Sequence, residues 1–385
     1  MLRIGIFISL ERGRDRALVK GIAAFARTRP DWTMVLSPLP EDVRWSQRVL
    51  AEYDGLIVRI RTSALDRWLA SRHARAINVS DVLQVKRLPY VGPDNHAVGR
   101  CIARHLLDLG YQHVAYYGEL DKWHARSRLA GLTEALAAYG RDAPRLLGVP
   151  TDTSLRSLRS LRAALRKLAK STALVAATDR LAITLCEACR QAGIRVPEDL
   201  ALLGVNNDDL LCELARPTLS SVDIGAEQLG QAAAEMLDTW VRDATAQPPA
   251  MLAAPPEPRV VSRDSTGLAP DLDRHVAAAL AFIRTRVGQG LAVDHVLEHV
   301  RISRTALDVR LKQAVGRTIH GEIAHQRLLH AQHLLLRTEL PLGEVANRSG
   351  YSSQQRFSNV FSAAMKQTPL AYRRRRGLTE AVPGP

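Results

Sequence analysis

The sequence has few cysteines and no long apolar run, and each shortage excludes a class of protein. Four cysteines in 385 residues are too few for a disulfide framework, so a reducing compartment is expected. No apolar run approaches the roughly 20 residues that span a bilayer. The opening segment MLRIGIFISL is too short, and too soon followed by charges, to be a signal peptide. We therefore expect a cytoplasmic protein that does not enter a membrane.

Signatures of catalysis, cofactors and metals are missing as well. The sequence has no GxGxxG motif, no P-loop, no nucleophile elbow and no Ser/His/Asp arrangement. Cys186 and Cys189 form a lone CxxC without a second pair at ligand spacing. The alternative of a metabolic enzyme with an accessory helical domain lacks any acid, base or nucleophile constellation. We expect neither an enzyme nor a bound cofactor or metal.

Basic charge is plentiful and is concentrated near the carboxyl end. The whole chain carries a net charge of +14, and its length suggests two or three domains. Residues 271–385 contain 17 Lys and Arg against 9 Asp and Glu, a net of +8. Such an excess favours contact with the phosphates of nucleic acids. The run 373–376 is either a solvated tail or part of that contact.

Residues 342–367 follow the pattern of a helix-turn-helix. Gly350 ends the first helix, Ser353 can cap the second, and Phe357, Phe361 and Met365 recur on its inner face. An ordinary helical hairpin is the alternative, and the fit of the whole pattern favours DNA binding. The outer face of the second helix carries side chains suited to base edges, namely Gln354, Gln355, Arg356 and Asn359.

A second unit of the same kind occupies residues 291–316. Ser303 stands at the turn, and Leu307, Leu311 and Val315 form the inner stripe of the helix after it. A long helix over 319–337 separates the two units, so they can enter adjacent major-groove faces about one helical turn apart. The candidate DNA-facing side chains of this unit are Arg304, Thr305, Asp308, Val309 and Lys312.

Both units together resemble the DNA-binding domain of AraC/XylS-type transcription regulators. A basic residue often follows the second phenylalanine in that family, and Ser362 stands there instead. The resemblance therefore does not decide whether this position contacts the DNA backbone. The matching residues are Ser303, Leu307, Leu311 and Gly316 in the first unit, and Val345, Ala346, Gly350, Tyr351, Ser353, Phe357, Phe361, Thr368, Pro369, Tyr372 and Arg373 in the second.

The first two thirds of the chain alternate between strand and helix patterns. Strands spaced by helices of this length predict doubly wound α/β sheets, and two such series predict two lobes with a cleft at the carboxyl ends of the strands. Strands are expected over 2–9, 32–36, 55–60, 76–79, 113–117, 173–177 and 201–204, and helices over 17–28, 95–110, 128–139 and 181–192. Residues 154–170, which could be low complexity or a basic membrane helix, are better explained as an amphipathic helix on the sheet.

Several stretches of this part resemble the effector domain of LacI/GalR repressors, which has a periplasmic-binding-protein-like fold. They include YVGPDNHAVGRCIARHLLDLGYQHVAYYG, RLAGLTEALAAYG, ALVAATDRLA and GIRVPEDLALLGVNNDD, and the resemblance covers residues 1–266. The expected fold class is therefore a two-lobed α/β periplasmic-binding-protein-like sensor domain over 1–267, followed by an all-α domain with two helix-turn-helix units over 268–385.

A LacI-like sensor followed by an AraC-type domain is the arrangement of xylose-operon regulators. The resemblance implies a transcription regulator that binds DNA and a small sugar, with D-xylose the expected effector. A transport-type binding protein is opposed by the helix-turn-helix pair and the missing signal peptide. The resemblance also implies a homodimer and allows contact with RNA polymerase. Another sugar or metabolite as effector is the alternative.

Polar residues near the expected strand ends are the candidates for sugar binding, because sugars need bidentate donors and acceptors and an aromatic face. Asp179 and Arg128 match ligand-contacting positions of the LacI-like family. Asn206 stands where an aspartate is common, which removes a charge-assisted acceptor and leaves the ligand's identity open. The other candidates, Asp15, Arg16 and Trp123, follow strands or precede helices. A surface or hinge salt bridge is the alternative for each.

Overall fold

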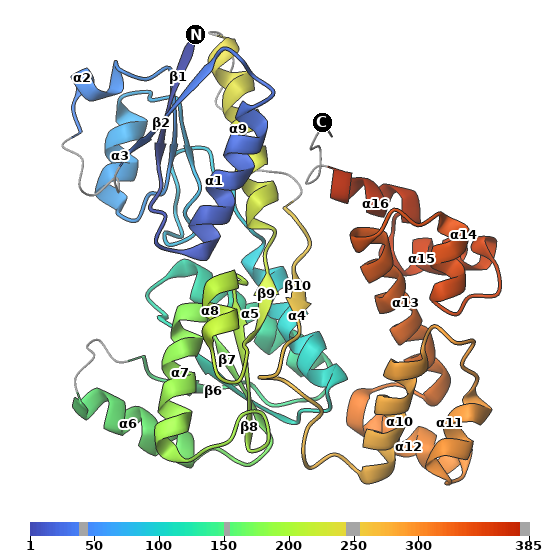
Figure 1. The fold of residues 1–385 in the computed structure, drawn as a ribbon. Helices are drawn as coiled ribbons and strands as arrows, with labels where there is room; N and C mark the ends of the chain where they lie inside the picture. Colours follow the sequence, from blue (N-terminus) through green and yellow to red (C-terminus); the bar gives the residue numbers. More distant parts are fainter. Residues whose placement is uncertain (38–44, 150–154, 244–254, 378–385) are drawn as a thin grey trace. The chain divides into compact units, whose positions relative to one another are not determined.

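The computed structural model describes residues 1–37, 45–149, 155–243 and 255–377, shown in Figure 1. The chain divides into two compact units. The α/β unit comprises Met1–Leu106 and Tyr111–Gly267, and the helical unit comprises Leu107–Gly110 and Leu268–Pro385. Among the described helices, none combines the length and the apolar character that a membrane span requires.

The first lobe of the α/β unit is built on a four-stranded parallel sheet. Its strand order is β2-β1-β3-β4, and the register places Ile4 opposite both Met34 and Gly55. Helices α2 and α3 cover one side of the sheet, and α1 and α9 cover the other (Figure 1). The bounds are β1 Leu2–Phe7, α1 Gly13–Ala26, β2 Trp32–Ser37, α2 Gln47–Leu50, β3 Gly55–Val58, α3 Ser63–Ser71, β4 Ala76–Asn78 and α9 Ala226–Arg242.

The second lobe has a six-stranded sheet of order β10-β9-β8-β7-β5-β6, in which only β10 is antiparallel to its neighbour. In the amphipathic helix α6, Leu161 and Leu165 are buried in the core, and residues 150–154 before it lie outside the described part. The bounds are α4 Asn95–Asp108, β5 His113–Tyr117, α5 Trp123–Ala138, β6 Arg145–Leu147, α6 Leu155–Arg166, β7 Thr172–Ala176, α7 Asp179–Ala192, β8 Leu200–Val205, α8 Asp209–Leu214, β9 Ser220–Asp223 and β10 Arg259–Val261.

The two lobes pack one helix pair in the same way. In the first lobe, a Cβ on Gly21 of α1 would lie 1.8 Å from the carbonyl oxygen of Glu227 in α9. In the second lobe, a Cβ on Gly131 of α5 would lie 2.0 Å from the carbonyl oxygen of His96 in α4. Each glycine is the ninth residue of its helix. Only glycine allows backbones to approach this closely, so α1 and α5 occupy corresponding places in the two lobes.

The helical unit contains the two predicted helix-turn-helix segments. Its long helix α13 places Ile319 and Ile323 in a first apolar core and Ala331 and Leu335 in a second, so it connects the two segments. The bounds are α10 Arg274–Arg286, α11 Val293–Val300, α12 Arg304–Val315, α13 Ile319–Arg337, α14 Leu342–Arg348, α15 Gln354–Met365 and α16 Pro369–Gly377.

The predicted fold class, a two-lobed α/β unit followed by a helical unit, is confirmed. Two predicted helix starts are wrong by four or five residues, and a third, that of α7, is wrong by two. Helix α1 begins at Gly13 and not at residue 17, and α5 begins at Trp123 and not at residue 128. The residues before them, Arg12 and Lys122, make no side-chain capping bond, so no local signal marks either start.

Candidate ligand site and nucleic-acid interface

Asp15 lies in the first turn of α1 and is fully buried. Its Oδ1 atom is 3.1 Å from Nε of Arg59, which follows β3, but neither carboxylate oxygen has a hydrogen-bond partner among the described residues. Burial lowers the pKa of Arg59 to about 10 although Asp15 opposes the shift. The ion pair with Arg59 compensates the buried charge of Asp15, and its oxygens keep capacity to accept hydrogen bonds from a further donor. Arg59 was not predicted from the sequence, because its only signal is a charge directly after a fully apolar strand.

Arg128 belongs to a buried polar network between the lobes. Its Nε donates to Oδ1 of Asn95 at 2.8 Å, and its Nη1 donates to the carbonyl of Ala177 at 2.5 Å. Arg14 donates to Asp81 at 2.5 Å, and Asn95 donates to the same carboxylate at 3.2 Å. Nη2 of Arg128 keeps no hydrogen bond among the described residues. We call Arg14, Asp15, Arg59, Asp81, Asn95 and Arg128 the interlobe cluster.

The charges of the interlobe cluster determine its ionisation. Burial alone would raise the pKa of Asp81, but Arg14, His124 and Arg128 hold it well below its usual range. Burial lowers the pKa of His124 to about 4, so the imidazole is neutral at pH 7. The cluster therefore combines fixed carboxylates with fixed guanidinium groups, which can donate to and accept from a polar neutral ligand.

Asp179 is 1% exposed and is the first residue of α7. The hydroxyl of Ser221 donates to its Oδ1 at 2.5 Å, and the backbone N–H of Asp208 donates to its Oδ2 at 2.7 Å. Burial raises the pKa of Asp179 to about 6. Both oxygens thus have protein partners already, and each retains one lone pair for a further donor.

The remaining predicted ligand residues lie near the same end of the α/β unit, and they differ in how many of their polar or aromatic groups already have protein partners. Asn206 has a φ of 111°, and its buried Oδ1 has no hydrogen-bond partner among the described residues. Arg16 is 3.1 Å from Asp208 Oδ1, so its charge is already paired. Trp123 is half-buried, and Nζ of Lys86 lies 4.1 Å from the centre of its ring.

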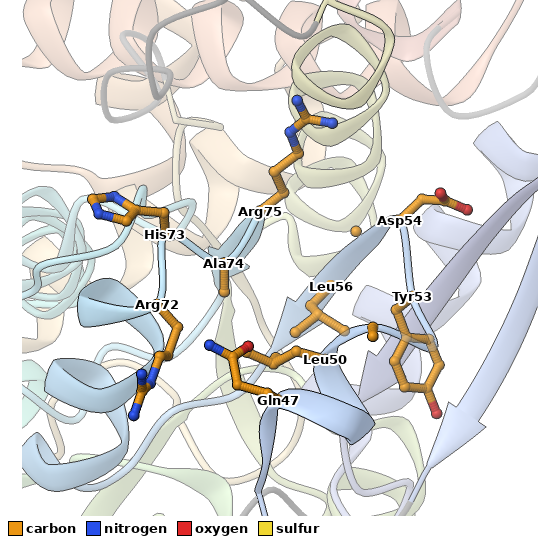
Figure 2. A pocket seen from close by; sticks show the side chains of 11 residues that line it. Gln47, Leu50, Tyr53, Asp54, Leu56, Arg72, His73, Ala74 and Arg75 are labelled. Atoms are coloured by element: carbon orange, nitrogen blue, oxygen red, sulfur yellow. The ribbon is translucent and has the colours of Figure 1, made fainter.

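A separate cavity of about 420 Å³ lies at the other end of the first sheet, where β3 begins (Figure 2). Figure 2 shows Leu50 and Leu56 in the middle of the residues that line it, with the polar side chains of Asp54, Arg72 and His73 farther out. None of the predicted ligand residues lines this cavity. The predicted site at the carboxyl ends of the strands is therefore distinct from it.

In the helical unit, α12 and α15 expose eight of the nine predicted DNA-facing residues. Ser303 and Ser353 cap these helices by accepting from the backbone N–H groups three residues later, as the sequence indicates. Asp308 differs from the others, because it is half-buried and accepts from the backbone N–H of Ile319 at 2.8 Å. This contact gives Asp308 a structural role at the start of α13. The exposed residues are Arg304, Thr305, Val309, Lys312, Gln354, Gln355, Arg356 and Asn359.

An aromatic cluster beneath α15 fixes its orientation. The ring of Phe357 lies 5.3 Å from that of Tyr351 and 5.5 Å from that of Phe361, which in turn lies 5.2 Å from Tyr372. Arg373 donates to the carbonyl of Leu340 at 2.6 Å, so the first arginine of the 373–376 run supports the fold of the helical unit.

Comparisons with known proteins agree with this arrangement. A periplasmic binding protein-like domain matches residues 103–266, and a helix-turn-helix domain matches residues 296–375. The xylose operon regulatory protein of Escherichia coli (strain K12) is 30% identical over 383 residues, 96% of each chain. The protein of the same name from Haemophilus influenzae is 30% identical over 290 residues, 74% of each chain.

Solved structures give the same result. A xylose-binding transcription activator, XylR, is similar with a TM-score of 0.59 and 28% identity, over 97% of this chain and 98% of that one. The CelR–cellobiose complex, at 22% identity, shares the fold of the α/β unit with a TM-score of 0.56 over 69% of this chain and 84% of that one.

Proposed function

Because the chain belongs to the family of xylose operon regulatory proteins, we propose that its effector is D-xylose, bound between the lobes of the α/β unit. The chain is a sugar-sensing, DNA-binding transcription regulator of this family. It is not an enzyme, since its relatives are transcription regulators. The choice of D-xylose rests on relatives of moderate sequence identity and on the chemistry of the interlobe cluster.

The unfilled hydrogen-bonding capacity of buried groups carries the proposal. Both oxygens of Asp15, Nη2 of Arg128 and Oδ1 of Asn206 are buried without hydrogen-bond partners among the described residues. A pentose carries hydroxyl groups that donate and accept around a small ring, which is the chemistry that such buried groups require. In this arrangement Asp15 and Asp179 accept, Arg128, Arg16 and Arg59 donate, and Trp123 faces the C–H side of the ring.

The proposed DNA contacts are made by α12 and α15. Gln354, Gln355, Arg356 and Asn359 are suited to base edges, and Arg304, Thr305 and Lys312 serve the first unit. We assign the domains to residues 1–267 and 268–385. We also propose that the protein is a homodimer in the cytoplasm. Contact with RNA polymerase is proposed because the solved relative is an activator.

Titration calorimetry on the full chain tests the effector. D-Xylose should release heat and raise the unfolding temperature, whereas D-ribose, L-arabinose and D-glucose should bind at least tenfold more weakly. Asp179→Ala should remove the D-xylose response, because unpaired hydroxyls in a dry site cost about 1–3 kcal/mol. DNA binding should be unaffected by this change.

Asp238→Ala is the matched control. This carboxylate is also buried in the α/β unit, but it is held by Arg29 and Trp32 and makes no contact with the interlobe cluster among the described residues. The control should lose stability and keep its affinity for D-xylose. No heat with any pentose, together with a clear response to another metabolite, would replace D-xylose and leave the regulator assignment intact.

A further inference from the structure

Two helices begin at the boundary between the lobes without a cap of their own. The first N–H groups of a helix need acceptors, yet the side chains of Arg12 before α1 and Lys122 before α5 supply none. The two starts are built alike. Arg16 and Arg126, each the fourth residue of its helix, donate to carbonyl oxygens of the loop that precedes it.

The missing acceptors come from the opposite lobe in both cases. The N–H of Gly13, in α1 of the first lobe, donates at 2.7 Å to Oδ2 of Asp208, which follows β8 of the second lobe. Conversely, α5 of the second lobe starts against the segment after β4 of the first. There the backbone N–H of Trp123 donates to the carbonyl of Val82 at 2.9 Å, and the backbone N–H of His124 donates to the carbonyl of Asp81 at 3.1 Å. Each lobe thus caps a helix of the other.

Asp208 is held firmly on its own side of this contact. Its backbone N–H donates to Asp179 at 2.7 Å, and its carboxylate also caps α8 through the N–H of Leu211. Oδ1 is 3.1 Å from Nη2 of Arg16, which adds an ion pair between the lobes. The fit leaves no room, because a Cβ on Gly13 would lie 2.3 Å from Cγ of Asp208.

We propose that Asp208 is the latch that holds the two lobes together, by capping α1 across the lobe boundary in concert with the reciprocal cap on α5. Separating the lobes would expose both helix starts at once, so the two caps open as a single event. The latch sets how much of the unliganded sensor already occupies the closed form. Effector affinity scales with that fraction, because only the closed form completes the site. The proposal depends on the two-lobed fold and holds for any sugar.

Hydrogen exchange measured peptide by peptide on the unliganded full chain tests the latch with Asp208→Ala. Amides at the starts of α1 and α5 should both exchange about tenfold faster, the effect of losing one charged helix cap. The acceleration at α5 is the decisive readout, since no atom of Asp208 caps that helix. Acceleration confined to α1 and α8 would reduce Asp208 to a local cap and overturn the proposal.

Gly13→Ala provides a second variant that leaves every polar group in place. Its added methyl would separate α1 from Asp208, so α5 should again lose protection, even if Asp208→Ala fails to fold. Unchanged exchange at α5 in this variant would also refute the latch. The matched control is Thr62→Ala, which removes the cap of α3 within the first lobe. It should accelerate exchange at α3 alone, and acceleration at α5 in this control would show that the readout reflects general instability.

Calorimetry with D-xylose connects the latch to the effector. Both latch variants should bind D-xylose about tenfold more weakly than the wild-type chain, in proportion to the lost closed fraction. If the wild-type chain gives no heat with D-xylose, the proposed effector fails while the exchange result stands by itself. Unchanged affinity in variants whose α5 has lost protection would contradict the link between latch and affinity.

Discussion

Replacing Asp179 by asparagine should stabilise the unliganded protein at pH 7. Burial raises the pKa of this carboxyl to about 6 from the usual 3.8, so keeping it charged in the folded state is unfavourable. At about 1.4 kcal/mol per pKa unit, the cost at pH 7 is about 3 kcal/mol at most. Asparagine removes the charge, but its single oxygen can accept from only one of Ser221 and Asp208, which costs about 1 kcal/mol. The net gain should be about 1–2 kcal/mol.

The gain should depend on pH with a definite sign. A raised carboxyl pKa stabilises the fold fully below 3.8, and this contribution is lost as the pH rises through 6. His124 has the opposite effect, because its pKa is lowered to about 4, so its contribution is present above 6.5 and lost as the pH falls towards 4. The two contributions offset each other in the wild-type chain. In Asp179→Asn only that of His124 remains, so stability should fall more steeply on acidification.

Urea unfolding at pH 7, 6 and 5, followed by tryptophan fluorescence, measures the effect. All five tryptophans lie between residues 32 and 240, so their fluorescence reports on the α/β unit and not on the helical unit. The advantage of Asp179→Asn should shrink steadily from pH 7 to pH 5. A constant difference across this range, or a variant that is less stable at pH 7, would refute the assignment of a charged and desolvated Asp179.

Two further predictions concern the DNA-binding surface. Binding of the full chain to its own promoter should weaken steeply with salt, by a log–log slope of about −0.9 for each phosphate contacted; a flat salt dependence would contradict the use of the +8 net charge of residues 271–385. Arg356→Ala should relax specificity at one or two base positions by about 1–3 kcal/mol in a competition assay against mutated sites, whereas a uniform loss over all sequences would assign Arg356 to a phosphate.

The sequence predicted those elements whose signals are local. The strand His113–Tyr117 was predicted with its observed bounds, because a short apolar run between polar ends is typical of a buried strand. The helices α12 and α15 begin where Ser303 and Ser353 indicate, since each serine caps the helix that follows it in the chain. The helix-turn-helix pair is readable for the same reason: its turns, caps and inner stripes lie within a few residues of one another.

Elements that depend on distant partners were missed or misplaced. Helix α9 was not predicted, and it belongs to the first lobe although more than 100 residues of the second lobe precede it. The residue before it, Gly225, supplies no side-chain cap, and Gly230 of the helix packs on the carbonyl of Leu18. The starts of α1 and α5 were misplaced because their acceptors come from the other lobe. No pattern within a single helix carries this information.

The candidate site likewise contains residues that the sequence predicted and residues that only the structure identifies. Resemblance to the family led to Arg128, Asp179 and Asn206, whereas Asp81 and Asn95, which bind Arg128 or its neighbours, were not predicted. Their importance comes from meeting Arg128 in space. Family patterns identify positions that face a ligand, and the structure is needed to find the residues that position them.

Asp179 connects the proposed sugar site to the latch. Its Oδ2 accepts from the N–H of Asp208, so the strength of that bond depends on the charge of Asp179. At pH 7 this carboxyl, with a pKa of about 6, is already mostly charged; in the proposed complex, a sugar hydroxyl that donates to its free lone pair should keep it charged as the pH falls towards 6. The charged form holds the backbone of Asp208 more tightly, and Asp208 holds Gly13 across the lobe boundary. If both proposals hold, sugar binding and the contact between the lobes should support each other through this carboxylate, and acidification below pH 6 should weaken both.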